Sequence, residues 1–122
     1  METGQKLTND LGVVNISKEV ISIMAGLTAM ECYGLVGMAS QSFQDGISEL
    51  VGVKNLSKGI EINITEEGVE LDLYIVVEYG VKISEVANNV MDRVKYTLEE
   101  KAGVKVKEVN INVQGVRLDH VE

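Results

Sequence analysis

Apolar and polar residues alternate from Val69 to Tyr79, and this is the clearest pattern in the chain. A period of two with one apolar side is typical of a strand that buries one face. Gly80 then ends the run. The predicted inward residues are Val69, Leu71, Leu73, Ile75, Val77 and Tyr79, and the predicted outward residues are Glu70, Asp72, Tyr74, Val76 and Glu78.

A helical period and a second strand follow. Apolar residues recur at three- and four-residue spacings up to Leu98, which predicts a helix with one buried face, and Gly103 is suited to end it. The residues expected on that face are Ile83, Val86, Ala87, Val90, Met91, Val94 and Leu98. In the final strand, Val109, Ile111 and Val113 are expected to point inward, and Asn110, Asn112 and Gln114 outward.

An earlier helix is predicted from Ser17, whose hydroxyl can cap the first turn, to about Tyr33, with Gly34 after its end. The residues expected to be buried on it are Val20, Ile23, Met24, Leu27 and Met30. A short strand, residues 12–16, precedes the helix, with Val14 and Ile16 expected inward.

A hairpin is predicted where Ile60, Ile62 and Ile64 alternate with polar residues before the turn Glu66–Glu67–Gly68. Residues 35–58 give no clear period, although a short helix around residues 42–51 fits them. The predicted organisation is a flexible N-terminal tail over residues 1–11, one domain over residues 12–117 and a short tail over residues 118–122.

The resulting order is β-α-β-β-α-β, with one apolar face on each element. This order predicts an α+β fold, a two-layer sandwich with helices on one face of a mostly antiparallel sheet, of the ferredoxin-like or ring-building kind. The strand order stays open, because the first strand could insert into the sheet or lie at its edge.

Composition narrows the functions that fit this fold. The 122 residues carry a net charge of −8, which disfavours nucleic-acid binding and adhesion to anionic lipid. One cysteine excludes an intramolecular disulfide and favours a reducing compartment. No apolar signal segment opens the chain, and the least charged window, residues 20–44, is too interrupted for a membrane span. We therefore expect a cytoplasmic protein without direct membrane insertion.

The sequence contains few residues in patterns typical of a catalytic or cofactor site. Cys32 and His120 could be offered as nucleophile and base, but a buried, inert cysteine is the commoner case. With one His and one Cys, a transition-metal site is not expected. The arginines, Arg93 and Arg117, lie far from the first strand–helix turn, where an acyl-phosphate hydrolase would need one. We expect no enzyme activity and no cofactor.

The outward side of the predicted sheet is the candidate interaction surface. Tyr74 and Val76 stand there among carboxylates, and a polar stripe of Asn110, Asn112 and Gln114 lies on another strand. One interpretation is a solvated face with two residues that favour strands. The other is a surface for self-association or for a protein partner, since rimmed apolar patches often mark interfaces.

Several segments together resemble the bacterial alkaline-shock protein family. They are GVVNIS before a helix, YGLVGM, KGIEINI, the strand VELDLYIVVEYG leading into VKISEVANNVMDRV, and AGVKVKEVNINVQGV, which together cover about residues 11–117. Ser84 stands where the family often has proline, and either residue suits a first helical turn.

The resemblance implies a small cytoplasmic protein of envelope or alkaline stress with no known catalytic activity. It also implies self-assembly and, in some members, recruitment to the membrane by a protein anchor. The alternative is a small-ligand or RNA-binding module on a ferredoxin-like scaffold. Such a module needs exposed aromatics and basic strands, and Tyr74 among carboxylates does not meet that need.

Overall fold

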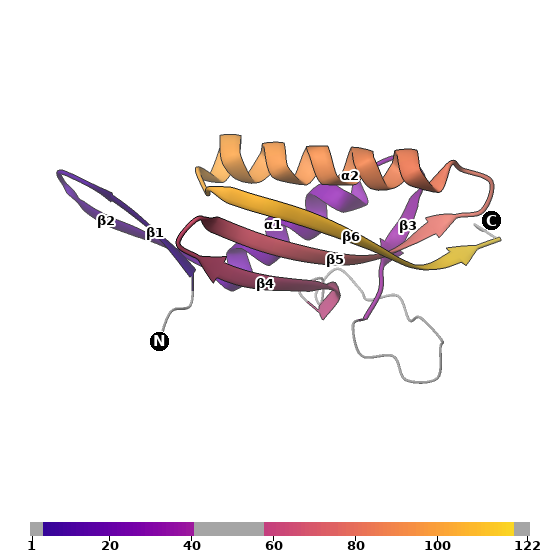
Figure 1. Ribbon diagram of the computed structural model, residues 1–122, viewed down its shortest axis with the longest axis horizontal. Coiled ribbons are helices and arrows are strands. Elements are labelled where there is room, and N and C mark those ends of the chain that lie inside the picture. The colour runs from indigo at the N-terminus through magenta and orange to yellow at the C-terminus, as the bar shows by residue number, and fades with distance from the viewer. Residues whose placement is uncertain (1–3, 41–57, 119–122) are drawn as a thin grey trace.

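The computed structural model describes residues 4–40 and 58–118 of the chain (Figure 1). The elements in chain order are β1 (Gly4–Asn9), β2 (Gly12–Ser17), α1 (Lys18–Met30), β3 (Leu35–Met38), β4 (Ile60–Thr65), β5 (Gly68–Glu78), α2 (Ile83–Thr97), a π-helical turn (Leu98–Ala102) and β6 (Val106–Arg117). The predicted α+β class is confirmed, and a hairpin precedes the first helix.

Strand β5 is the centre of the main sheet. β6 runs parallel to it along one edge, from Val69 to Glu78, so β3 and β4 must share the other edge, both antiparallel to β5. α1 and α2 cover the same face, because Ala25 of α1 and Val90 of α2 lie in one core cluster with Leu73 of β5. The sheet is therefore mostly antiparallel with helices on one side, as predicted.

The alternation in β5 correctly identified its buried side. The side chains from Val69 to Val77 on the predicted inward side are fully buried in the core. Tyr79 is the exception: it is 68% exposed, because β5 ends at Glu78 and Tyr79 lies in the turn that follows. In β4, Ile60 is buried and Ile62 and Ile64 pack against the core, as predicted.

Strands β1 and β2 form a separate two-stranded sheet that extends away from the rest of the molecule, and we call this hairpin the arm (Figure 1). The expectation of a flexible tail over residues 1–11 is wrong for residues 4–9. These residues are mostly polar, and it is pairing with β2 that makes them a strand, so hydrophobic periodicity gave no signal. Val14, expected inward, is 50% exposed, whereas Ile16 packs against the core.

Helix α1 begins as predicted, because the Ser17 hydroxyl accepts a hydrogen bond from the Val20 amide at 3.2 Å. Its predicted buried face is wrong for four of the five residues, whereas Met24 packs against the core. The side chains of Val20, Ile23, Leu27 and Met30 are between 38% and 46% exposed, and we call these four residues the outward face of α1. The buried residues are instead Ile21, Ser22, Ala25, Gly26, Thr28 and Ala29.

The physical reason lies in the size of the buried residues. α1 contacts α2, β3 and β4, and the distance between packed elements depends on the side chains at the contact. Small residues such as Ala25 and Ala29 allow a close approach, which leaves the larger apolar side chains on the opposite side of the helix.

Helix α2 packs largely as predicted. Val86, Val90, Val94 and Leu98 are buried, while Ile83 at its first turn is 41% exposed. The helix continues into the π-helical turn, and Gly103 ends it with φ of 72°, a left-handed conformation that suits glycine. Strand β3 was not predicted, because four residues that include a glycine show no period. The short helix suggested for residues 42–51 falls outside the described residues.

Candidate interaction surfaces

The outer sheet face, opposite the helices, brings together most of the residues predicted to form an interaction surface. Tyr74 of β5 pairs in register with Asn112 of β6, and Asp72 pairs with Asn110. The Asn112 amide donates to the Leu73 carbonyl at 3.4 Å, and the Asn110 amide donates to Glu108 at 3.2 Å. Gln114 lies at an irregularity in the β5–β6 register. Tyr74, Asn110 and Asn112 therefore lie near one another on one face, and their role as an interaction surface stays a prediction.

Val76 does not belong to the exposed part of that surface. Its side chain is 1% exposed, so the expectation of an exposed apolar residue there is wrong. Strand alternation assigns a residue to one side of a sheet and carries no information about whether that side is covered. Gly37 and Gly115 are its register partners on the two neighbouring strands.

Tyr74 is half-buried and has acidic neighbours. Its pKa is raised above the ordinary value, first by desolvation, then by the charges of Glu61 and Asp72 and by a hydrogen bond to Glu61. The phenol therefore stays protonated over the physiological range. It presents a hydroxyl donor and an aromatic ring, the amphipathic combination that is enriched at protein interfaces.

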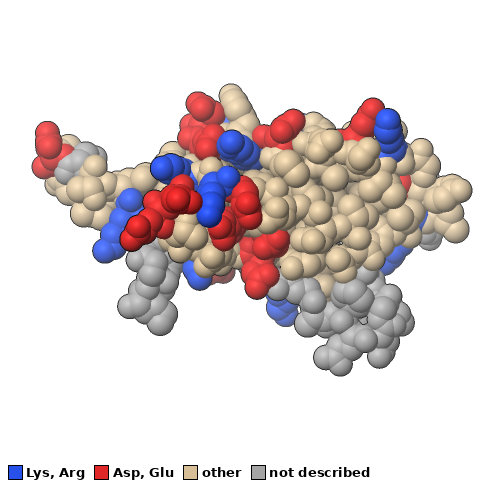
Figure 2. All heavy atoms as spheres, in the orientation of Figure 1, with Lys and Arg blue, Asp and Glu red and all other residues tan. Residues whose placement is uncertain are grey.

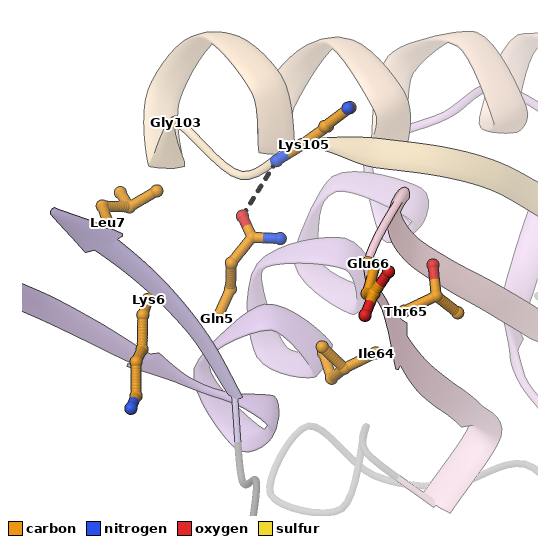
Figure 3. Close-up of a pocket in the computed structure, with 8 residues that line it drawn as sticks. All are labelled: Gln5, Lys6, Leu7, Ile64, Thr65, Glu66, Gly103 and Lys105. Carbon is orange, nitrogen blue, oxygen red and sulfur yellow. Dashed lines mark hydrogen bonds between the residues drawn. The ribbon is translucent and has the colours of Figure 1, made fainter.

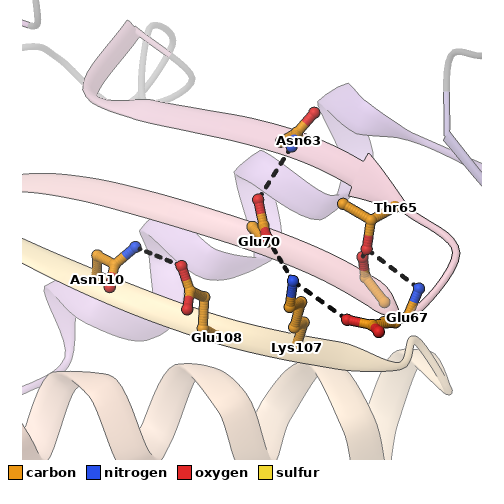
Figure 4. A network of polar contacts seen from close by, with 8 residues as sticks. Asn63, Thr65, Glu67, Glu70, Lys107, Glu108 and Asn110 are labelled. Carbon is orange, nitrogen blue, oxygen red and sulfur yellow. Dashed lines mark hydrogen bonds and ion pairs between the residues drawn. The ribbon is translucent and has the colours of Figure 1, made fainter.

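Beside this cluster, an ion-pair network (Figure 4) occupies the end of the sheet at the β4–β5 turn. The Lys107 ammonium lies 3.1 Å from Glu70 and 3.2 Å from Glu67, and Asn63 donates to Glu70 at 3.0 Å. The pKa of Glu70 is lowered by the hydrogen bonds from Asn63 and Lys107, and that of Lys107 is raised by those to Glu70 and Glu67. These groups stabilise one another.

The two halves of the outer sheet face thus differ in charge. Figure 2 shows acidic and basic side chains gathered near the arm, while the surface over the other half of β5 and β6 is largely uncharged. Among the described residues of β4 and β5, Glu61, Glu70 and Asp72 outnumber basic groups on this face. RNA-binding proteins typically present a basic surface, so this face does not favour the RNA-binding alternative.

The outward face of α1 is a further surface, and the sequence prediction missed it by placing these residues in the core. No charged residue occurs between Glu19 and Glu31, a span of about three helical turns. The sequence did contain a signal for this orientation. The small residues Ala25, Gly26 and Ala29 lie on the other side of the helix, where they allow a close contact.

A cleft of about 520 Å³ separates the root of the arm from the main sheet (Figure 3). Gln5 and Leu7 of β1 line one wall, and Ile64 and Glu66 line the other. The Gln5 side chain accepts a hydrogen bond from the Lys105 amide at 2.9 Å, which ties the root of the arm to the body. Sequence patterns gave no sign of this cleft, because it depends on where the arm emerges.

Cys32 is buried, and its thiol donates weakly to the Thr28 carbonyl at 3.7 Å. Burial raises the pKa of the thiol, which disfavours the reactive thiolate. His120 lies outside the described residues. Over residues 4–40 and 58–118, no group of three or more His, Cys, Asp or Glu is placed to hold a metal ion, and none of the described helices is long and apolar enough to cross a bilayer.

Comparison with known proteins settles the family. A model of the alkaline shock protein family (ASP23 family, cell envelope-related function) matches residues 6–118. The chain belongs to this family. The Bacillus subtilis protein YloU is 46% identical over 93% of this chain and 95% of its own length. A Streptococcus pyogenes protein, Spy1614, is 39% identical over 93% and 94%. Both relatives are uncharacterized, so the family supplies the cell-envelope context without a mechanism.

Solved structures of a domain titled MamM CTD resemble the chain more distantly. One variant covers 80% of this chain and 95% of that domain at 11% identity, with a TM-score of 0.49. A zinc form covers 84% and 86% at 10% identity, with a TM-score of 0.48. A likeness of this degree concerns the general fold and carries no inference about ligands.

Proposed function

We propose that this protein serves cell-envelope homeostasis without catalysing a reaction, by associating with further copies of itself and with other proteins. The family membership supports the envelope context. The observation that carries the self-association is the outward face of α1, where four large apolar side chains are between 38% and 46% exposed. Contiguous exposed apolar patches of this kind often mark protein interfaces.

A second copy of the chain is the occupant that fits the outward face of α1. Each copy carries a net charge of −8, and like charge keeps molecules apart. Contact between copies is therefore least opposed where no charge is present, and the helix is uncharged between Glu19 and Glu31. Two such helices can bury their apolar side chains against each other by ordinary ridge-and-groove packing.

The polar cluster on the outer sheet face, which borders Glu61, Asp72 and Glu108, is proposed as the contact for a different protein. Tyr74 with Asn110, Asn112 and Gln114 offers an aromatic ring and amide groups, which supports a polar protein–protein contact. A membrane-anchoring protein is the partner we propose for it, which would hold a cytoplasmic protein at the inner side of the envelope. Val76 is left out of this surface because it is buried.

Sedimentation equilibrium over a wide protein concentration range tests the self-association. The wild-type chain is expected to form larger species as concentration rises, and Leu27→Asp is expected to weaken this by placing a charge on the outward face of α1. Leu118→Asp is the matched control, because Leu118 is also exposed, at 74%, and lies outside that face. A wild-type chain that stays monomeric at the highest concentration refutes the proposal.

A further inference from the structure

The arm carries apolar side chains where the molecule offers them little cover. Leu11 in its turn is 98% exposed, and Val13 and Val14 on β2 are 53% and 50% exposed. Val13 pairs with Thr8 and Val14 with Leu7, and neighbouring residues of a strand point to opposite sides. Both faces of the arm are therefore partly apolar. An isolated two-stranded hairpin is marginally stable at best in water, so a further partner would stabilise it.

The free edge of β1 faces the cleft at the root of the arm. Among the described residues, β1 pairs with β2 alone, and three consecutive β1 residues, Gln5, Lys6 and Leu7, line the cleft. Figure 3 shows β1 lying between β2 and the cleft, with Ile64 and Glu66 on the far wall. An unpaired strand edge is a template for another strand, and here the edge borders a space into which such a strand could enter.

We propose that two copies of this chain exchange their arms, β1 of each pairing antiparallel with β1 of the other. The tip of each arm then lies at the cleft of its partner. The inference rests on the self-association proposed above and adds a second contact between copies, separate from the outward face of α1. Two hairpins become one four-stranded sheet, which exceeds the two strands that are marginal alone.

Two-fold symmetry makes the length of one arm match the distance from the root to the tip of the other. In a two-fold contact the same patch meets itself, so antiparallel arms of equal length place each tip at the partner's root. Six residues of β1 give about 20 Å between these points. The arm of the second copy can therefore pair with the free edge of β1 and place its tip at the cleft at the same time.

Charge selects the register of this pairing. When Thr8 stands opposite Thr8 of the second copy, residues 7–9 of the two β1 strands pair. The turn residues Asp10 and Leu11 then lie next to Lys6 and Gln5 of the second copy, at the cleft. Opposite charges facing each other across strands are stabilising, and like charges are destabilising. Both pairs occur twice in the dimer, and Leu11 meets the apolar walls formed by Leu7 and Ile64.

A single-cysteine crosslink in a Cys32→Ala background tests the contact. Thr8→Cys places two cysteines opposite each other across the two-fold axis, where paired strands hold their Cα atoms about 4.5–5.5 Å apart, within the range of a disulfide. Val13→Cys is the matched control, since Val13 is the register partner of Thr8 within the arm and lies on β2. Mild oxidation is expected to give a covalent dimer with Thr8→Cys at least about tenfold faster than with Val13→Cys.

Charge reversal tests the register independently by sedimentation. Asp10→Lys and Lys6→Asp are each expected to weaken self-association about tenfold, and the double variant, which keeps the net charge of −8, is expected to restore it. General repulsion predicts otherwise, because Asp10→Lys makes the chain less negative by about two charges and would strengthen association. Two results would overturn the arm exchange alone while self-association persists. One is equal crosslinking of the two cysteine variants, and the other is a double variant that does not restore association. A chain that never associates overturns the proposed function as well.

Discussion

Helices α1 and α2 pack on the same face of the sheet, yet their apolar residues are used differently. In α2 and the π-helical turn that continues it, the large residues Val90, Val94 and Leu98 are buried, and polar residues face outward. In α1 the buried side combines Ile21 with small residues such as Ala25, and Leu27 on the opposite side is 46% exposed. The difference shows that hydrophobic periodicity identifies a helix more securely than it identifies the buried side of that helix.

The decisive feature is what stands opposite the large apolar residues. In α2 the opposite side holds Asn88, Asp92 and Lys95, which cannot be buried cheaply, so one choice of face is left. In α1 the opposite side holds no charged residue: Ala25 and Ala29 are buried there with the small polar residues Ser22 and Thr28, and these small side chains allow close packing. A helix with two burial-competent sides has its orientation decided by tertiary packing, and its larger side becomes available for a partner.

Truncating one leucine on each helix is expected to give the largest contrast. Leu98→Ala removes a fully buried side chain and should lower the free energy of unfolding by about 2–5 kcal/mol. Leu27→Ala removes a half-exposed one and should change it by about 0.5 kcal/mol. Urea denaturation at the lowest workable concentration measures both. Equal losses would show that the outward face of α1 is buried within a single chain.

Enlarging the small side of α1 is expected to have the next largest effect. Ala25→Leu inserts a branched side chain into a fully buried position and should cost about 1–3 kcal/mol in thermal or chemical unfolding. Met30→Leu on the exposed side conserves volume and serves as the control. A tolerated Ala25→Leu would mean that close packing does not determine the orientation of α1.

The two helix starts differ in a way that predicts effects of opposite sign. Ser17→Ala removes the hydroxyl that accepts from Val20 and should destabilise the protein by about 1 kcal/mol. Lys82 at the start of α2 provides no side-chain cap, so Lys82→Ser should stabilise by a smaller amount. Thermal unfolding of both variants checks the pair, and a destabilising Lys82→Ser would contradict the capping argument.

An exposed ion pair joins the two helices and should contribute least. Arg93 of α2 lies 3.2 Å from Glu31 at the end of α1, with side chains 47% and 68% exposed. Exposed pairs contribute about 0–1 kcal/mol and weaken with salt. A double-mutant cycle with Arg93→Ala and Glu31→Ala at low and high salt measures the coupling. A larger, salt-independent coupling would show that this pair is a principal link between the helices.

Much of the fold could be predicted because strict patterns specify it. The alternation in β5, the stripe of α2 and the Ser17 cap each have a single physical interpretation, and each is confirmed. The arm could not be predicted, since β1 is a polar strand made by pairing with β2. Val76 shows the same limit on the candidate surface: alternation placed it on the correct side, and tertiary structure decided its burial.

The outward face of α1 and its contact with a second copy form the central claim, and thiol labelling tests it directly. Leu27→Cys in a Cys32→Ala background is labelled with a maleimide over a range of protein concentrations, and sedimentation is followed on the same samples.

We predict fast labelling in dilute protein and progressive protection as larger species form, because association covers the helix face. Labelling that stays fast while the protein associates would contradict the role of α1, and protection in dilute, monomeric protein would contradict its orientation.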